Sequence, residues 1–203
     1  MSRVRVAVLA SGSGTTFENL VLRSRDGRLD AEIVRLIADR ECGAVEKAHR
    51  LKVPAIVIPW EAKSPKRWGS KIAAALAQEP RPDLVCMGGF LRLWRVRERW
   101  IGRVLNIHPA LLPAFGGKGM HGRHVHEAVL ASGATESGCT VHLASNEYDA
   151  GPIIVQKRVR VLPGDTPESL AARVFAAECD AYPEAIRLIA DSMQGRRAEV
   201  ADR

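Results

Sequence analysis

Two side chains that can handle protons and charge stand near the middle of the chain, in the run Asn106-Ile107-His108-Pro109. In an extended strand, residues two positions apart project to the same side, so the Asn106 amide and the His108 imidazole would face one site. An imidazole transfers protons near neutral pH, and an amide N–H stabilises a developing oxyanion. The pattern fits a catalytic site at a strand end as well as it fits a structural histidine.

A single carboxylate, Asp149, stands before Ala150-Gly151-Pro152, between two β-rich runs. Aspartate is common in turns because its side chain bonds the local backbone. A carboxylate can equally orient a histidine and raise the pKa of its imidazole. The separation of Asp149 from His108 along the sequence does not decide between these two interpretations.

The run Ser11-Gly12-Ser13-Gly14-Thr15-Thr16 joins the first apolar run to a helical pattern. Glycines let a ligand approach the main chain, and the N–H groups at a helix start favour an anion such as phosphate. The run lacks the third glycine of a dinucleotide fingerprint and the Gly-Lys-Ser/Thr of a Walker A loop. It therefore predicts either a phosphate site or an ordinary tight turn between a strand and a helix.

The elements that must position these residues follow from the alternation of apolar runs and helical spacing. Apolar β-branched runs closed by Gly or Pro alternate with helical segments, which indicates βαβ units and a parallel sheet. The order is that of a Rossmann-like, doubly wound α/β domain, in which ligands bind at the carboxyl ends of the strands. We expect strands at residues 4–10, 33–38, 55–59, 84–87 and 104–107, and helices at residues 16–25, 44–51 and 66–78.

The second half changes character after Pro109. A loop rich in Gly, Pro and His precedes a short helix, and two β-rich runs then predict an antiparallel C-terminal extension of the mostly parallel sheet. A long helix begins near Thr166, and we expect it to break at Tyr182-Pro183 and to resume before a frayed polar tail. The expected elements are the loop 109–123, the helix 124–132 and the strands 137–143 and 153–161.

Composition limits the partners. The net charge is +7, from 30 Lys and Arg against 23 Asp and Glu. This charge suits nucleic acid, and it suits phosphorylated or carboxylated small molecules equally well. Because no nucleic-acid recognition motif accompanies the charge, we expect no nucleic-acid partner. The densest basic group fits a solvated helix face at least as well as a binding patch; it comprises Arg92, Arg95, Arg97 and Arg99.

The signatures of membrane, secreted and metal-binding proteins are missing from the sequence. No apolar run reaches the roughly 18 residues of a membrane-spanning helix, and the N-terminal residues 1–7 lack a signal-peptide pattern. We therefore expect a cytoplasmic protein without a membrane partner. The four cysteines lie far apart, as expected of reduced thiols. His121, His124 and His126 lie close together without a clear fourth ligand, so we expect no metal.

Several motifs together resemble those of one family, the folate-dependent formyltransferases. The run 106–113, Asn-Ile-His-Pro-Ala-Leu-Leu-Pro, resembles the family signature, and the run 149–154, Asp-Ala-Gly-Pro-Ile-Ile, resembles its second motif. Three further motifs match in order and spacing, so the resemblance covers nearly the whole chain, to about residue 190. They lie at residues 11–14, 89–92 and 138–142.

The resemblance implies an enzyme that transfers the formyl group of 10-formyltetrahydrofolate to the amine of 5′-phosphoribosylglycinamide, in de novo purine (IMP) biosynthesis. It assigns the tetrahedral intermediate and the proton transfers to Asn106, His108 and Asp149, and the glycinamide end to Glu178. It places the substrate phosphate and ribose at Gly14, Thr15, Thr16, Phe17 and Glu18. It places the folate at Leu91, Arg92, Leu93, Trp94, Asn106, Ser145, Asn146, Glu147 and Tyr148.

The resemblance also implies how the chain is organised. Residues 1–195 would form one formyltransferase domain, with a phosphate-binding half at 1–103 and a catalytic and folate-binding half at 104–195. Residues 196–203 would form the polar tail. The co-substrate would be the formyl-folate, the partners would be small molecules, and the chain would act without a metal as a monomer or homodimer.

The sequence departs from the family pattern in four places. The first loop ends in Thr15-Thr16, which keeps hydroxyl contacts and loses an amide. The loop 116–123 is longer than in many relatives, and Cys179 stands beside Glu178 where histidine is frequent. A folate-contacting arginine expected before the third helix has no clear match among Pro65, Lys66 and Arg67.

Other activities fit parts of the same pattern. A sugar-amine formyltransferase stays open, although a phosphate loop favours the glycinamide ribonucleotide. A non-catalytic folate or nucleotide binder would need no set such as Asn106, His108 and Asp149. Methionyl-transfer-RNA formyltransferases carry an additional C-terminal domain and formyltetrahydrofolate hydrolases an additional N-terminal one, and we expect room for neither in this chain.

Overall fold

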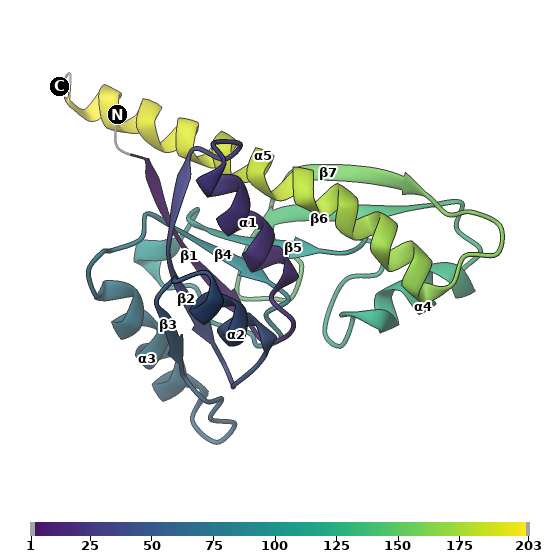
Figure 1. The fold of residues 1–203 in the computed structure, drawn as a ribbon, viewed down its shortest axis with the longest axis horizontal. Helices are drawn as coiled ribbons and strands as arrows, with labels where there is room; N and C mark the ends of the chain where they lie inside the picture. Colours follow the sequence, from purple (N-terminus) through teal and green to yellow (C-terminus); the bar gives the residue numbers. More distant parts are fainter. Residues whose placement is uncertain (1–2, 202–203) are drawn as a thin grey trace.

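The computed structural model describes residues 3–201, which are built around a seven-stranded sheet of order β3-β2-β1-β4-β5-β6-β7 (Figure 1). Strands β1 to β5 run parallel to one another, whereas β6 pairs antiparallel with β5 and β7 pairs antiparallel with β6. This confirms the predicted doubly wound, mostly parallel sheet with an antiparallel extension. The strands are β1 (Val4–Ala10), β2 (Ala31–Ala38), β3 (Ala55–Val57), β4 (Leu84–Gly88), β5 (Val104–His108), β6 (Glu136–Leu143) and β7 (Ile153–Arg160).

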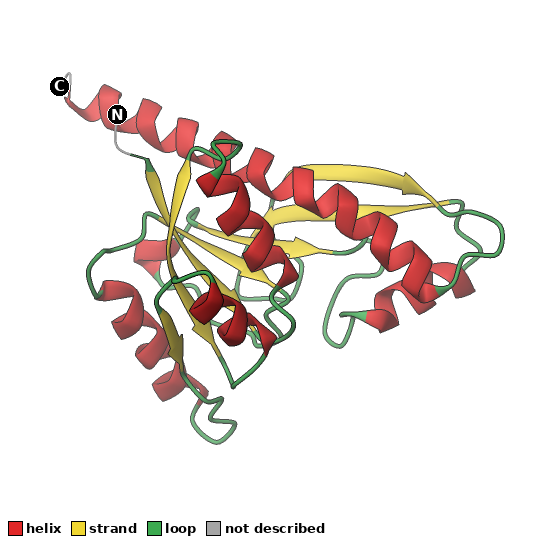
Figure 2. Ribbon diagram, in the orientation of Figure 1, coloured by secondary structure: helices red, strands yellow, loops and turns green. Residues whose placement is uncertain are grey.

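Helices cover both faces of this sheet (Figure 2). Helices α1, α2 and α5 contribute to one apolar core cluster, and α3 contributes to a second cluster on the opposite face. This division is the doubly wound arrangement that right-handed crossovers produce. The helices are α1 (Thr15–Arg25), α2 (Gly43–Arg50), α3 (Pro65–Ala77), α4 (Arg123–Ala131) and α5 (Pro167–Ala201), with a short 3₁₀ turn η1 (Glu98–Trp100).

Strand β1 shows why this sequence forms a buried central strand. Val6, Val8 and Ala10 pack into the first core cluster, and Ala7 and Leu9 pack into the second. Successive side chains of a strand alternate between the two faces, so a strand covered by helices on both sides must be apolar at every position. β1 therefore lies inside the sheet, between β2 and β4, and carries the glycine-rich run at its carboxyl end.

Helix α5 continues without a break through Pro183, so the break predicted at Tyr182-Pro183 is wrong. Proline removes the N–H that would bond the carbonyl four residues earlier, which is that of Cys179. Here the side chain of Asn19 donates to the Cys179 carbonyl oxygen at 3.3 Å instead. The buried Tyr182 hydroxyl also lies within hydrogen-bond distance of two main-chain acceptors, Met87 O of β4 at 2.9 Å and Leu105 O of β5 at 3.0 Å. Tertiary contacts thus offset the loss of the helical hydrogen bond.

Two other segments differ from expectation. The exposed Arg95, Arg97 and Arg99 lie on an irregular segment that ends in the single turn η1, so the predicted helix face is wrong. Helix α5 also includes residues 196–201, where we expected a polar tail, and residues 202 and 203 lie outside the described part. Between residues 3 and 201, none of the helices is both long enough and apolar enough to cross a membrane.

Candidate active site

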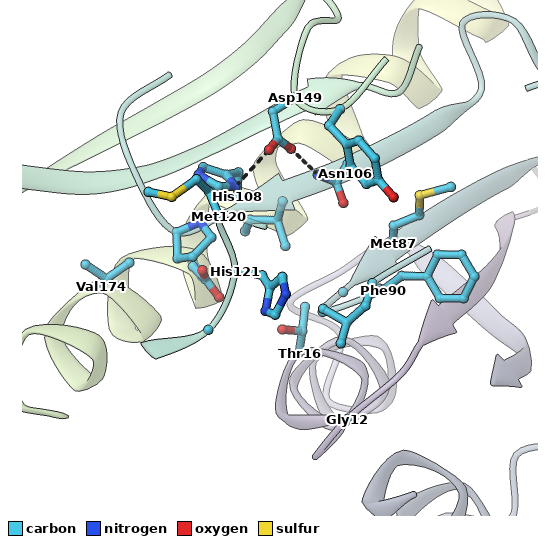
Figure 3. A pocket seen from close by; sticks show the side chains of 18 of the residues that line it. Gly12, Thr16, Met87, Phe90, Asn106, His108, Met120, His121, Asp149 and Val174 are labelled. Atoms are coloured by element: carbon cyan, nitrogen blue, oxygen red, sulfur yellow. Dashed lines mark hydrogen bonds and ion pairs between the residues drawn. The ribbon is translucent and has the colours of Figure 1, made fainter. Parts of the chain in front are cut away.

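A cavity of about 930 Å³ opens at the carboxyl ends of β1, β4 and β5 (Figure 3). This volume lies within the range of small-molecule sites, and the position is where open α/β sheets bind ligands. Its walls come from segments far apart in the sequence. They include residues 12–16, 87–94, 106–109, 117–123 and 147–149, the residues His142, Ala144 and Ser145, and part of α5.

The structure brings Asn106, His108 and Asp149 together in this cavity, as Figure 3 shows. Asp149 Oδ2 lies 3.4 Å from His108 Nδ1, and Asp149 Oδ1 accepts a hydrogen bond from Asn106 Nδ2 at 3.3 Å. The backbone of Asp149 is left-handed, with φ of 53°. Aspartate tolerates this conformation better than most residues. Asp149 therefore serves both interpretations considered above, since it shapes the turn and contacts the histidine.

The cavity contains a further histidine, His142, to which the sequence analysis assigned no role. His142 Nε2 lies 3.0 Å from Asn106 Nδ2, and His142 Nδ1 lies 3.0 Å from the Leu143 carbonyl oxygen. A carbonyl oxygen accepts only, so Nδ1 carries the proton and a neutral His142 accepts from Asn106 through Nε2. Together with Asp149, His142 therefore engages both amide hydrogens of Asn106. Predicting this contact would require the antiparallel register of β5 against β6, which pairs Asn106 with His142.

Both ring nitrogens of His108 face hydrogen-bond acceptors. His108 Nε2 lies 2.8 Å from the Phe115 carbonyl oxygen, so Nε2 donates, and Nδ1 faces the Asp149 carboxylate. A proton on Nδ1 would complete an imidazolium held between the two acceptors. The His108 side chain is almost wholly buried, and its surroundings therefore decide its charge.

Burial has the larger effect on His108. It lowers the pKa of the imidazole below its ordinary value, although the Asp149 charge and the Phe115 carbonyl act in the opposite direction. Asp149 therefore acts to raise the pKa of the imidazole, as the second interpretation of this residue requires, but its effect is smaller than that of burial. Burial raises the pKa of Asp149, but its polar contacts, those with His108 and the Gly117 N–H among them, outweigh it and hold that pKa below its usual range. The carboxylate is thus ready to favour a proton on His108.

The glycine-rich run forms the tight turn between β1 and α1 and lines the same cavity. Gly14 precedes α1 with φ of 73°, and a Cβ atom there would lie 2.5 Å from Ala44 Cα. Only glycine fits both the backbone conformation and this close approach. Thr15 and Thr16 follow on the first turn of α1, and Thr16 faces the cavity in Figure 3. The turn therefore presents hydroxyls and helix N–H groups to a ligand.

Three predicted binding residues have side chains elsewhere. Phe17 is 0% exposed in the core between α1 and the sheet. Glu18 pairs with Lys47 at 2.6 Å and with Arg50 on α2. The Asn146 side chain accepts from the Val96 N–H at 3.0 Å. None of these three residues is among those that line the cavity.

The predicted folate residues otherwise lie on one wall. Two loops provide them, one after β4 and one after β6. Arg67, one of the candidates for a missing folate contact, pairs instead with Glu61 at 2.6 Å. The lining residues of this wall are Leu91, Arg92, Leu93, Trp94, Ser145, Glu147 and Tyr148.

The long loop between β5 and α4 forms another wall of the cavity, with Lys118, His121 and Arg123 among its lining residues. The Gly117 N–H donates to Asp149 Oδ2 at 3.0 Å, so the loop is tied to the central carboxylate. His121 points into the cavity in Figure 3. In the described residues, no three His, Cys, Asp or Glu side chains gather as a metal site would require.

Glu178 of α5 lines the cavity with its side chain almost wholly buried. Burial raises the pKa of its carboxyl group to about 7. Within residues 3–201, no side chain forms an ion pair with it that would offset this effect. The thiol pKa of the neighbouring Cys179 is also raised by burial, so that thiol adds no charge here. An amine or amide ligand would supply the donor that Glu178 lacks.

A model of the formyl transferase family matches residues 4–186. The chain belongs to the formyl transferase family. It is 39% identical over 193 residues to the chloroplastic phosphoribosylglycinamide formyltransferase of Arabidopsis thaliana; this match covers 93% of the chain and 66% of the relative, just under two thirds of its length.

Two solved structures of formyl transferases resemble this chain along most of their length. A phosphoribosylglycinamide formyltransferase from Brucella melitensis is 39% identical with a TM-score of 0.82, covering 93% of this chain and 96% of that one. A glycinamide ribonucleotide transformylase 1 from Symbiobacterium toebii is 37% identical with a TM-score of 0.84, covering 94% of this chain and 89% of that one. The fold therefore agrees with the family match.

In this formyl transferase, we expect Glu178→Gln to remove a pH-dependent cost to stability. Below pH 4.5 the carboxyl group is neutral in both the folded and the unfolded chain. Between 4.5 and the folded pKa of about 7, only the unfolded chain ionises, so the native protein is progressively disfavoured. The total loss approaches roughly 3 kcal/mol.

Denaturant unfolding at a series of pH values from 4 to 8 measures this effect. The free energy of unfolding of Glu178→Gln should gain on that of the unchanged protein as pH rises, and level off above about 7. If the two curves stay parallel across this range, the buried carboxyl group does not have the raised pKa.

Proposed function

We propose that this formyl transferase moves the formyl group of 10-formyltetrahydrofolate to the amine of 5′-phosphoribosylglycinamide, a step of de novo purine (IMP) biosynthesis. One observation carries the proposal. Asn106, His108 and Asp149 meet in the same cavity as the glycine turn, so an acceptor bound through its phosphate can reach the proton-handling residues. The names of the similar enzymes support the same substrate.

The reaction requires one bond to form and one to break. The amine nitrogen of the ribonucleotide attacks the formyl carbon, whose carbonyl oxygen becomes an oxyanion in a tetrahedral intermediate. The bond from this carbon to the folate nitrogen then breaks, and that nitrogen gains a proton while the amine loses one. The protein must therefore stabilise an oxyanion and move protons between two nitrogens.

His108 and Asp149 suit the proton transfers. The His108 Nδ1 position lies against the Asp149 carboxylate at 3.4 Å, so a proton there is favoured by the charge. Burial favours neutral His108, and a developing oxyanion would add a second negative charge that favours the imidazolium. We assign His108 as the proton donor to the leaving nitrogen and Asp149 as the residue that holds this proton in reach.

Asn106 suits the oxyanion. Its two amide hydrogens bond His142 Nε2 at 3.0 Å and Asp149 Oδ1 at 3.3 Å. The contact with Asp149 is the longer of the two, so we propose that an oxyanion replaces it. His142 then keeps the amide correctly oriented, because Nε2 continues to accept one hydrogen.

The phosphate of the acceptor would bind the glycine turn, at Gly14, Thr15 and Thr16. We expect Thr16→Val to raise the KM for the ribonucleotide about tenfold, which corresponds to one lost hydrogen bond to a charged group. Thr16 packs closely against Gly88, since a Cβ atom added to Gly88 would lie only 2.9 Å from Thr16 Cβ. Valine has the same shape as threonine, so it should preserve this packing. Steady-state kinetics should show the KM for the formyl donor unchanged. An equal rise in both KM values would contradict a role in phosphate binding.

The donor would lie along the wall formed by Leu91 to Trp94 and by Ser145, Glu147 and Tyr148, and Glu178 would receive the glycinamide end. We further propose that residues 1–195 act as one unit, as a monomer or homodimer, on small molecules alone and without a metal. Four free cysteines, two of them buried, support a reducing, cytoplasmic location.

One assay tests the proposed function. The purified protein is mixed with 10-formyltetrahydrofolate, and loss of the donor is followed with and without 5′-phosphoribosylglycinamide. We expect loss only when the ribonucleotide is present. Loss at the same rate without it would indicate hydrolysis, and binding of the donor without turnover would indicate a non-catalytic binder.

A further inference from the structure

A buried carboxylate, Asp39, lies outside the cavity at the carboxyl end of β2. Its side chain is 1% exposed, yet two arginines bond it. Arg92 Nε donates to Asp39 Oδ2 at 2.9 Å, and Arg40 donates to both carboxylate oxygens at 3.2 and 3.1 Å. Burial raises the pKa of Asp39, but these contacts outweigh it and hold the pKa below its usual range.

Two contacts restrain the Arg92 guanidinium: Asp39 accepts a hydrogen bond from its Nε, and the Trp60 ring packs against its face. The Arg92 guanidinium carbon lies 5.3 Å from the centre of the Trp60 ring, a cation–π contact. The backbone N–H of Trp60 in turn donates to the Asp39 carbonyl oxygen at 3.2 Å, so Asp39 holds both Arg92, through its side chain, and Trp60, through its main chain. A guanidinium held at its Nε edge and on its face has little rotational freedom left.

The same carboxylate is linked to the loop that carries Arg92. The Leu91 N–H donates to Ser11 Oγ at 3.0 Å, and the Ser11 hydroxyl also bonds Asp39. The Ser11 N–H donates to the Gly89 carbonyl oxygen at 3.1 Å. Asp39 therefore connects the ends of β1 and β2 with the segment that begins at Gly89.

The two Nη groups of Arg92 are available to bind a ligand. Arg92 lines the cavity, and its side chain is 33% exposed. Among residues 3–201, Asp39 is the one acceptor that bonds it, and that bond uses Nε alone. The two Nη groups can therefore bind a carboxylate through two parallel hydrogen bonds. Because Asp39 is shielded behind the arginines, its own charge does not face such a ligand.

We propose that Asp39 is a positioning residue that presents Arg92 to the acidic tail of the formyl donor. The proposal rests on the proposed function, in which the donor is a folate whose glutamyl tail ends in carboxylates. Arg92 touches the tail, and Asp39 acts only through Arg92. The consequence is specificity for a carboxylated donor, without any part in the chemical step.

Asp39→Asn tests this, because it keeps the shape of the side chain and removes its charge. The kinetics are measured with 10-formyltetrahydrofolate and with its diamide, in which both glutamyl carboxylates are neutral. We expect the KM for the charged donor to rise about tenfold and that for the diamide to stay constant. The turnover number and the KM for the ribonucleotide should also stay constant. Thermal unfolding checks that the variant is folded.

Arg92→Ala keeps the test decisive if Asp39→Asn does not fold. It should lose the same discrimination between the two donors, and the double variant should show no further loss. The matched control is Arg40→Ala, which removes the other arginine on Asp39 and should discriminate as the unchanged protein does.

The outcomes separate this proposal from the proposed function. If the unchanged protein transfers no formyl group from either donor, the proposed function fails first. If it is active but Asp39→Asn slows both donors equally or lowers the turnover number, Asp39 is merely structural and the proposal is overturned. Unchanged discrimination in Arg92→Ala would overturn it as well.

Discussion

Replacing His108 with alanine should lower kcat about a thousandfold while leaving the protein folded. A positioned general acid contributes a factor of roughly a hundred to ten thousand, and His108 is the group that the proposed mechanism uses to protonate the leaving nitrogen. Neither substrate is held chiefly by His108, so both KM values should change little. Removing the ring leaves the Phe115 carbonyl without its partner at 2.8 Å, at a stability cost of about 1–3 kcal/mol.

Steady-state kinetics and thermal unfolding measure the two effects separately. The matched control is His124→Ala, which removes an exposed imidazole 3.3 Å from Glu127 on α4 and should leave kcat unchanged. Turnover near that of the unchanged protein in a folded His108→Ala variant would exclude His108 as the proton donor.

Replacing Asp149 with asparagine should lower kcat at least a hundredfold and shift its pH dependence. Asparagine tolerates the left-handed backbone at this position, where φ is 53°, so the change is mainly one of charge. The carboxylate accepts from Asn106 Nδ2 and from the Gly117 N–H through its two oxygens. An amide offers only one acceptor oxygen, so one of these contacts must become a clash between donors.

The direction of the pH shift follows from the charges around His108. Asp149 raises the pKa of His108 against the larger, opposite effect of burial, so its loss must lower that pKa further. The decline in kcat that accompanies deprotonation of His108 should therefore begin at lower pH in Asp149→Asn. A decline at the same or a higher pH would show that Asp149 does not act on the charge of His108. Asp26→Asn, at an exposed carboxylate paired with Arg28, serves as the matched control.

The sequence predicted the parts of the site that depend on local periodicity. The spacing of Asn106 and His108 in a strand places both on one side, and Gly14 stands where a left-handed turn and the close approach of Ala44 exclude other residues. The parallel sheet follows from apolar runs such as that of β1. These features are properties of single elements, so a single sequence suffices to predict them.

The sequence did not reveal features that depend on contacts between distant elements. The contact between Asn106 and His142 requires the register of β5 against β6. The unbroken helix at Pro183 depends on Asn19, which lies 160 residues from Cys179. Phe17 was expected to bind substrate, but the orientation of α1 buries it. In each case a tertiary contact overrides the local preference.

The central claim is that the formyl carbon passes to the amine of the ribonucleotide. Its most direct test follows an isotopically labelled formyl group from 10-formyltetrahydrofolate by mass spectrometry, with equal amounts of protein and with 5′-phosphoribosylglycinamide present. We predict that the label appears in the N-formylated ribonucleotide and that His108→Ala lowers the rate at which this product forms about a thousandfold. Recovery of the label as free formate, with the ribonucleotide unchanged, would contradict the claim.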